Sequence, residues 1–176
     1  MGCTIISAAG NEGSSDWGEV IYSYPAGFDN VLSVASIYYK IKSGSISFAE
    51  TYYSNRNSMV DACSIGQEVL STTPGNLYGI NSGTSMACPH VSGYAALLHE
   101  KINKMWRGKK RNNSCNLFSM VKASTVPINT NKLNGQTGLI NNITGAGMVT
   151  AFPKLPTRKK FRYGCFYIED MDPVLY

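Results

Sequence analysis

One stretch near the middle of the chain constrains the fold more than any other. Residues 81–98 read NSGTSMACPHVSGYAALL, where a turn at Ser82-Gly83 precedes small and apolar side chains on nearly all faces of a helix. A helix that is apolar all round is a buried helix. We therefore expect a buried central helix that continues to about Trp106. Pro89 is compatible with it, because proline in a first turn removes few hydrogen bonds.

The hydroxyl of Ser85 lies at the start of this predicted helix. A helix N-terminus offers unpaired N–H groups and partial positive charge, which suit developing negative charge on a reacting group. One interpretation of Ser85 is therefore a nucleophile. On these residues alone, the favoured interpretation is a small side chain that caps the helix or lets it pack closely.

A second polar side chain follows a predicted strand. Residues 3–7 read as a buried strand and lead into AAGNEG at 8–13. Small residues after a strand permit a sharp turn and the close approach of another molecule. Asn11 thus lies at the carboxyl end of a strand, where open α/β sheets place ligand sites. The alternative is a turn asparagine that caps its own backbone.

The remaining elements are predicted from patterning and turn residues. We expect a cis peptide bond before Pro25, because an aromatic residue precedes it. The other predicted segments are strands at 31–37 and 59–63, an extended piece at 45–48, a surface loop at 50–58, a hairpin at 69–80 with Pro-Gly-Asn at its turn, a helix at 113–124, a loop at 125–142 and renewed order at 145–151.

Composition narrows the function classes. The 176 residues suffice for one domain with a core, and no apolar run is long enough to span a bilayer. The net charge of +5 comes from basic clusters at 101–111 and 158–162. We interpret them as solvated surface, because neither lies in a recognisable nucleic-acid module. The five cysteines form no CxxC pair, so zinc is not indicated, and their odd number argues against a closed disulfide framework.

Several segments, in order, resemble the subtilisin-like serine proteases, the subtilases. Residues 83–93, GTSMACPHVSG, resemble the nucleophile motif of that family. The other matching segments are AAGNEG at 8–13 (the oxyanion-hole segment), YPA at 24–26 with NVLSVA at 30–35 (the next strand), STTPGNLY at 71–78 (before the serine) and GAGMV at 145–149 (the closing Gly-x-Gly step). Each is weak alone, but together they extend the resemblance over roughly residues 3–151, which are most of the chain.

The resemblance implies a fold and a set of roles. The fold is α/β, subtilisin-like and three-layered, with a mostly parallel sheet, helices on both faces, and an incomplete N-terminal side. Residues 1–151 would be the C-terminal part of a catalytic domain, and 152–176 a tail of unknown role. Ser85 would be the nucleophile and Asn11 the side-chain donor to the oxyanion. The residues implied to contact substrate are Gly10, Glu12, Ser23 and Thr84.

The sequence departs from the family pattern at two segments before the serine and in the triad residues. Ser64-Ile65-Gly66 replaces the usual Ala-Pro-Gly, and residues 50–58 depart from the usual Ser-Asn-Tyr-Gly. The triad Asp and His of the family lie upstream of the segment where this sequence begins. His90 follows Ser85 by five residues, about 140° around a helix, and His99 lies about 20 Å along it. We therefore expect neither to act as the catalytic base.

Two hypotheses of different classes follow. In the first, the chain is the C-terminal part of a subtilisin-like serine endopeptidase that hydrolyses polypeptides through an acyl-enzyme on Ser85. Its partners would be a polypeptide substrate and the missing N-terminal half of the catalytic domain, with no nucleic acid and no membrane span. In the second, the chain is a non-catalytic remnant that acts by binding or does not fold stably. By itself the chain is expected to be inactive.

Cofactors and location follow from the resemblance alone. No cofactor is identified and no metal ligands are assigned. Calcium is common in the family, but no set of spaced carboxylates indicates a site. The family expectation is secretion or the secretory pathway, with which two glycosylation sequons at 112–114 and 142–144 agree. The first residues lack the features of a signal peptide and look like the inside of a strand, which suggests a missing upstream segment.

Overall fold

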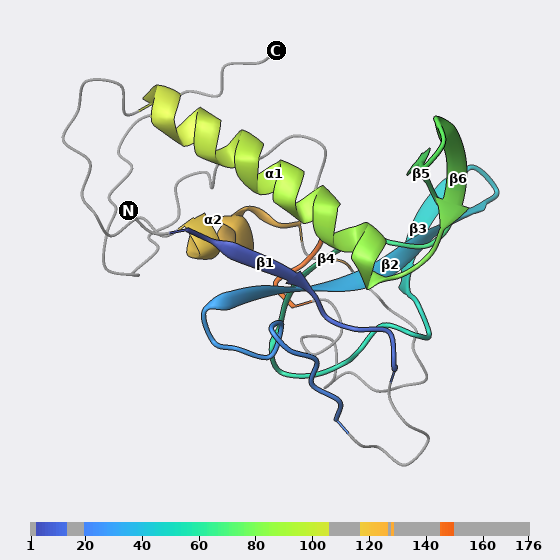
Figure 1. The fold of residues 1–176 in the computed structure, drawn as a ribbon, viewed down its shortest axis with the longest axis horizontal. Helices are drawn as coiled ribbons and strands as arrows, with labels where there is room; N and C mark the ends of the chain where they lie inside the picture. Colours follow the sequence, from blue (N-terminus) through green and yellow to red (C-terminus); the bar gives the residue numbers. More distant parts are fainter. Residues whose placement is uncertain (1–2, 14–19, 106–116, 127, 129–144, 150–176) are drawn as a thin grey trace.

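A computed structural model describes residues 3–13, 20–105, 117–126, 128 and 145–149. Its core is a four-stranded sheet with two helices, and a separate two-stranded sheet projects from it (Figure 1). The strands of the main sheet are β1 (Ile5–Ala8), β2 (Val31–Lys42), β3 (Ser45–Glu50) and β4 (Val60–Ile65). The other elements are β5 (Val69–Thr73), β6 (Leu77–Asn81), α1 (Thr84–Met105) and α2 (Leu117–Ser124).

The long strand β2 organises the main sheet. Its first half pairs in parallel with β1 on one side and with β4 on the other. Its second half pairs antiparallel with β3, from Ile37 opposite Glu50 to Lys42 opposite Ser45. Leu32 and Val34 face one core cluster, whereas Ala35 and Ile37 face another, as the two-residue period of a strand requires. The expected α/β fold with a mostly parallel sheet is therefore confirmed.

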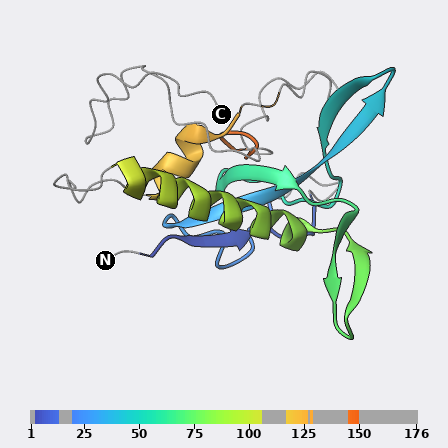
Figure 2. The ribbon, with the colours of Figure 1, turned by 90° about the horizontal axis from the view of Figure 1, so that it is seen from above.

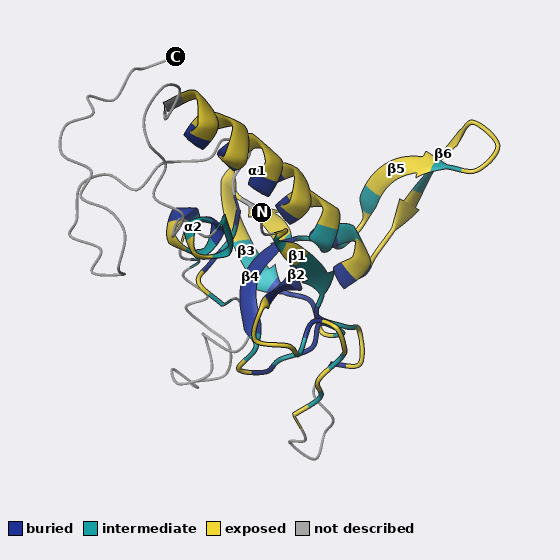
Figure 3. Ribbon diagram, turned by 60° about the vertical axis from the view of Figure 1, so that its left-hand side comes forward, coloured by how far each residue is buried: buried dark blue, intermediate teal, exposed yellow. Residues whose placement is uncertain are grey.

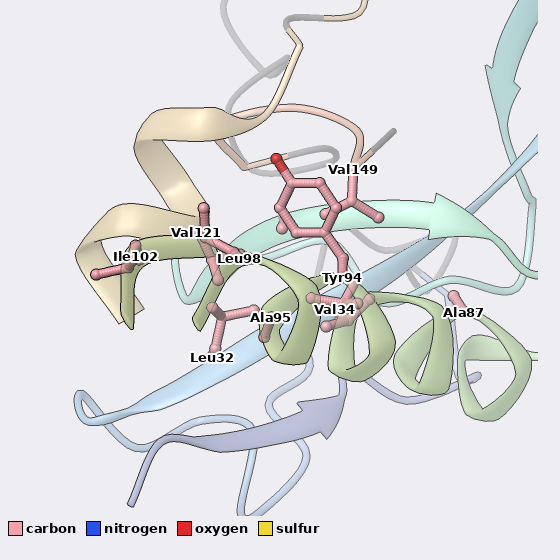
Figure 4. Packing of buried hydrophobic residues seen from close by; sticks show 11 residues of the cluster. Leu32, Val34, Ala87, Tyr94, Ala95, Leu98, Ile102, Val121 and Val149 are labelled. Carbon is pink, nitrogen blue, oxygen red and sulfur yellow. The ribbon is translucent and has the colours of Figure 1, made fainter. Parts of the chain in front are cut away.

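Helix α1 lies across this sheet with one apolar stripe. The stripe follows the spacing of three and four residues that brings side chains onto one helical face. Figure 4 shows it packed against Leu32 and Val34 of β2 and against Val121 of α2. The fully or nearly fully buried residues of α1 are Ala87, Val91, Tyr94, Ala95, Leu98 and Ile102. This packing fixes the direction from which the helix N-terminus meets the sheet.

The opposite face of α1 is exposed, which corrects the expectation of a helix buried on all sides. Ser92, Gly93 and Ala96 are exposed, and half of the surface of Leu97 is accessible. Figure 3 shows this as a continuous exposed band along the helix. The predicted strand at 3–7 is likewise exposed on one side, since β1 pairs with β2 alone among the described strands and Ile5 is 54% exposed. The described residues supply no layer over either surface.

The C-terminal described segments pack on the same side of the sheet as α1. The hydroxyl of Tyr94 donates to the carbonyl of Ser124 at 2.9 Å, which ties α2 to α1. Residues 145–149 add a short parallel contact to β4, where Cys63 N donates to Gly147 O and Val149 N donates to Cys63 O. Both described helices contribute to one core cluster. Among the described residues, helices therefore cover one face of the sheet, where two faces were expected.

Two hairpins project from the body of the molecule in different directions (Figure 2). The β5–β6 hairpin has the predicted Pro-Gly-Asn turn, with Leu70 opposite Ile80. The β2–β3 hairpin is longer than predicted, because β2 continues to Lys42 and β3 to Glu50. Each exposes apolar side chains, and Leu70, Ile80 and Ile41 are between 65% and 66% exposed. The predicted cis peptide bond between Tyr24 and Pro25 is also present.

The expectation of a surface loop at 50–58 is wrong. Five of its polar residues are buried, namely Glu50, Thr51, Ser54, Asn55 and Asn57. The side chains of four of them form hydrogen bonds with the backbone of neighbouring segments, namely Thr51, Ser54, Asn55 and Asn57. The fifth, Glu50, forms an ion pair with Arg56. Polar side chains that are paired in this way are compatible with burial.

Several predicted features lie outside the described residues. These are the first part of the predicted helix at 113–124, most of the predicted loop at 125–142, both sequons, and the tail at 152–176. Among the described residues, no helix has the length and apolar character needed to cross a membrane.

Candidate functional site

The candidate nucleophile lies in the first turn of α1. Ser85 is exposed, whereas the preceding Thr84 is completely buried. The turn before the helix is hydrogen-bonded to the segment between β4 and β5. Gly83 N donates to Gly66 O at 2.7 Å, and Glu68 N donates to Ser82 Oγ at 2.9 Å. Since α1 begins at Thr84, the N–H of Ser85 belongs to the first turn, where a helix offers no acceptor of its own. Ser85 therefore presents both a hydroxyl and an N–H group at an accessible helix end.

Asn11 contacts the residue beside Ser85. Thr84 N donates to Asn11 Oδ1 at 2.8 Å, and Thr84 Oγ1 donates to the same oxygen at 3.0 Å. Gly10 N in turn donates to Thr84 Oγ1 at 3.2 Å. A backbone N–H can only donate, so the carboxamide must turn its oxygen toward Thr84. Its nitrogen, Nδ2, then remains available as a donor, and no hydrogen bond within the described part of the chain uses it.

The glycine between the hairpin and α1 leaves room for this carboxamide. A Cβ atom placed on Gly83 would lie 3.3 Å from Asn11 Nδ2 and 3.6 Å from Asn11 Oδ1. The approach of Asn11 to the helix N-terminus is thus close, and a side chain at position 83 would crowd it. The structure brings Gly10, Asn11 and Thr84 together at the first turn of α1, immediately before Ser85.

The other two expected substrate-contacting residues form a second group. Ser23 Oγ donates to Glu12 Oε2 at 3.2 Å. Asn55 joins them, because its Nδ2 lies 2.6 Å from Glu12 Oε2 and 3.1 Å from Ser23 Oγ. The hydrogen bond from Asn55 holds the pKa of the Glu12 carboxyl below its usual value. Glu12 is exposed and charged at neutral pH, so this group presents a negative charge next to Asn11.

Asn55 was missed by the sequence analysis, which placed it in a surface loop. It is completely buried, although it carries only polar atoms beyond Cβ. The dipeptide Ser54-Asn55 is the first half of the Ser-Asn-Tyr-Gly pattern, and it was the signal available at this place. The following Arg56-Asn57 differs from that pattern, which concealed the match.

Among the described residues, neither histidine forms a hydrogen bond with Ser85. His90 Nδ1 is 2.9 Å from the carbonyl oxygen of Met86, one turn earlier in α1, so that nitrogen carries the proton. His99 is exposed further along the helix and contacts Asn103. The described residues contain no group of three or more His, Cys, Asp or Glu side chains arranged to hold a metal ion.

The class of protein follows from the comparison of this sequence with protein families. The sequence model of the subtilase family matches residues 1–147, from the strand before Asn11 to the segment that packs on β4. This match covers most of the chain, which therefore belongs to the subtilase family. The resemblance drawn from the segments around Asn11 and Ser85 is confirmed.

Individual relatives are serine proteases. The major intracellular serine protease of Bacillus subtilis (strain 168) is 32% identical over 139 residues, which are 79% of this chain and 41% of that protein. The intracellular serine protease of Paenibacillus polymyxa is 33% identical over 132 residues, 74% of this chain and 38% of that protein. Subtilisin E of Bacillus subtilis (strain 168) is 37% identical over 100 residues, 57% of this chain and 24% of that protein. The chain spans less than half of the length of these relatives.

A solved structure supports the same fold. The prenylagaramide maturation protease PagA matches with a TM-score of 0.58 and 24% sequence identity, over 82% of this chain and 46% of that chain. This likeness confirms the subtilisin-like arrangement of the sheet and helices.

Proposed function

We propose that the chain carries the nucleophile and the oxyanion donors of a serine endopeptidase. Ser85 Oγ would attack the carbonyl carbon of a peptide bond, and the carbonyl oxygen would become negatively charged as the tetrahedral intermediate forms. Asn11 Nδ2 and the N–H of Ser85 are the donors for that charge. The observation that carries the proposal is the pair of hydrogen bonds from Thr84 to Asn11 Oδ1, which leave Nδ2 without a hydrogen bond among the described residues, at the first turn of α1.

The base that accepts the proton of Ser85 is proposed to come from polypeptide outside these residues. A serine hydroxyl is a poor nucleophile without a base, and the described contacts of both histidines lie elsewhere on α1. The relatives are more than twice as long as the segment matched here. The exposed face of α1 and the edge of β1 that no described strand pairs with are surfaces that a further part of a catalytic domain would cover. Reading the gene upstream should reveal in-frame Asp-x-Gly and His-Gly-Thr segments, and their absence would remove the base.

Labelling with a fluorophosphonate probe tests the nucleophile. In the full-length protein, the probe should modify Ser85, and Ser85→Ala should abolish the labelling, because this probe forms a bond only with an activated hydroxyl. Ser92→Ala is the matched control, since Ser92 is an exposed hydroxyl on the same helix whose Oγ donates to Cys88 O. Labelling that persists without Ser85 would contradict the proposal. The 176-residue chain alone should label weakly, because loss of triad members leaves only the oxyanion hole and binding.

The second candidate is a chain that binds without catalysis or does not fold stably. The exposed face of α1 and the edge of β1, which is unpaired in the described part of the chain, favour it, because such surfaces promote association. Strong labelling of Ser85 in the isolated chain would exclude this candidate.

Substrate and location are proposed from the family alone. The substrate is a polypeptide. A secretory location is proposed from the family, although two relatives are named intracellular serine proteases. Sensitivity of the cellular protein to an endoglycosidase would support secretion, because the two sequons are glycosylated only in that pathway.

A further inference from the structure

Asn55 occupies the centre of a buried hydrogen-bond network beneath the candidate site. Its backbone N–H donates to Gly10 O at 3.0 Å. Its side-chain Oδ1 accepts from Glu12 N at 2.9 Å, and its Nδ2 donates to Ala9 O at 2.9 Å. Asn55 therefore bonds to the backbone of the residues on both sides of Asn11, although it lies more than forty positions away in the sequence.

Only a carboxamide satisfies all the partners of this side chain. Ala9 O and Glu12 Oε2 are acceptors and require N–H donors, whereas Glu12 N is a donor and requires an oxygen. An amide offers both kinds of group. A carboxylate of the same shape would lose the donors and would place a second negative charge next to Glu12.

The position of Gly10 shows how tightly the network closes on the backbone. Gly10 has a φ of 104°, a conformation that favours glycine, and a Cβ placed there would overlap Ser23 Oγ, Asn55 Nδ2 and Glu12 Oε2. The side chain of Asn55 thus fills the space next to Gly10. A residue with a side chain could therefore not replace Gly10 unless these groups moved.

Asn55 is itself anchored to the main sheet. Ser54 Oγ accepts from Ser36 N at 2.9 Å, and Thr51 Oγ1 donates to Ser36 O at 3.1 Å, in both cases buried. A continuous set of hydrogen bonds therefore runs from β2 through residues 51–55 to residues 9–12. From there Asn11 Oδ1 binds Thr84 at the first turn of α1.

We propose that Asn55 is a positioning residue that sets the orientation of the Asn11 carboxamide and of the Glu12–Ser23 pair. The inference rests on the proposed function, because orientation of Asn11 matters for catalysis only if Nδ2 receives the oxyanion. In this inference one residue, Asn55, holds both the Asn11 carboxamide and the Glu12–Ser23 pair in position. A disturbance at Asn55 changes the rate of the chemical step and the recognition of substrate near Glu12 together.

The sharpest variant is Asn55→Asp, which keeps the shape and exchanges the donor for an acceptor. Asn57→Asp is its matched control. Asn57 is also buried, and its Nδ2 donates to Ile21 O at 2.7 Å while its Oδ1 accepts from Met59 N at 3.0 Å, with no contact to residues 9–12 in either bond. Both substitutions bury a charge in the same segment, so both lower stability. Only Asn55→Asp disturbs the loop that carries Asn11.

Kinetics of the full-length protein provide the first readout. Displacing a catalytic group by about 1 Å costs about 100-fold in rate, so we expect Asn55→Asp to lower kcat by about 10- to 100-fold and Asn57→Asp to leave kcat within about threefold of wild type. Two neighbouring carboxyls share a proton, which raises the pKa of one of them. The ratio of variant to wild-type activity should therefore rise as the pH falls, because a protonated carboxyl regains one donor.

Nuclear magnetic resonance provides a second readout that does not depend on activity. The side-chain NH₂ signals of Asn11 and the carboxyl titration of Glu12 should shift in Asn55→Asp and not in Asn57→Asp. Unchanged Asn11 and Glu12 signals, or equal kinetic losses in the two variants, would overturn the inference. If Asn55→Asp shows these shifts but the wild-type protein hydrolyses no peptide, the proposed function is overturned and the positioning role remains intact.

Discussion

At the scale of single residues, the site depends on the two ends of one carboxamide. The oxygen of Asn11 accepts two hydrogen bonds from Thr84, and this fixes where the nitrogen points. A preorganised donor stabilises a developing oxyanion without moving, and for that reason such donors contribute more than an ordinary hydrogen bond. Thr84 is accordingly more than a neighbour of Ser85, since it holds the orientation of the donor.

The corresponding prediction concerns Asn11→Leu, which keeps the size of the side chain and removes both polar atoms. We expect kcat to fall by about 10²–10³, the loss reported for such a donor in a subtilisin of this family, with a smaller change in KM. Steady-state kinetics on the full-length protein measure it. Asn76→Leu, in the turn of the exposed hairpin, is the control and should leave kcat unaltered. An equal rise in KM with unchanged kcat would mean that Asn11 binds the ground state.

The residues that sequence reasoning identified and the one it missed differ in a physical way. Asn11 and Ser85 follow short-range signals, a strand end and a helix start, and the family motifs place them in order. Asn55 acquires its importance from Ala9, Glu12 and Ser23, which belong to two other segments that meet it only in the folded chain. No local sequence pattern encodes these contacts. The polar side chain of Asn55 even led to the prediction of an exposed position, whereas the residue is buried.

At the scale of elements, the segment 50–57 leads from β3 toward β4, and an ion pair joins its residues Glu50 and Arg56. Arg56 Nη2 lies 3.1 Å from Glu50 Oε1, whose side chain is only 6% exposed. The other carboxylate oxygen, Glu50 Oε2, is buried without a hydrogen-bond partner among the described residues. Burial raises the pKa of Glu50, and the attraction of Arg56 lowers it by a smaller amount.

This gives a pH-dependent prediction for Glu50→Gln. The folded pKa lies above the reference value of 4.5, so the contribution of Glu50 to stability is complete below that value and declines as the pH rises through the folded pKa. The variant lacks the charge, so its free energy of unfolding relative to wild type should increase between about pH 4 and about pH 7. Denaturant unfolding at both pH values measures the difference.

Glu100→Gln is the control for this experiment. Glu100 forms an exposed pair with Lys104 at 2.7 Å, and the hydrogen bond from Lys104 lowers its pKa. Its substitution should therefore produce little pH-dependent change, and in the opposite direction. Loss of stability in Glu50→Gln at neutral pH would show that the ion pair outweighs the cost of burying the carboxylate.

Elements were predicted well where local chemistry decides them. The β5–β6 hairpin has the turn that Pro74-Gly75-Asn76 favours, and Asn76 adopts a positive φ of 58° there. The length of β2 was underestimated, because its end pairs with β3 while residues 39–41 are exposed. Helix α1 begins and ends close to its predicted bounds. The small and apolar residues of its first half misled the prediction of burial, which depends on what packs against the helix.

At the scale of the whole molecule, the buried sheet provides a test of folding that is independent of catalysis. Cys63 on β4 is completely buried, and burial raises the pKa of its thiol, whereas Cys3 is exposed. Thiolates are the reactive form of cysteine. A maleimide should therefore modify Cys3 within minutes and spare Cys63 until denaturant is added, as read by peptide mass spectrometry.

The same experiment on the isolated chain tests whether it folds stably, which is one part of the second candidate. Rapid labelling of Cys63 in native buffer would contradict the packed sheet and favour a remnant that does not fold stably. Slow labelling of Cys63 beside rapid labelling of Cys3 would show that these residues form the sheet without further polypeptide. In that case a folded protein exposes the apolar face of α1. Association of the molecules through this face would be detected by sedimentation.

The contact between Asn11 and Thr84 joins positions 73 apart in the chain. A ribosome must therefore have released both Asn11 and the start of α1 before these two residues can meet. During the earlier stages of synthesis the nascent polypeptide holds the amide of Asn11 without Thr84 and Ser85. The orientation of this carboxamide is thus acquired only after the later residues have been synthesised.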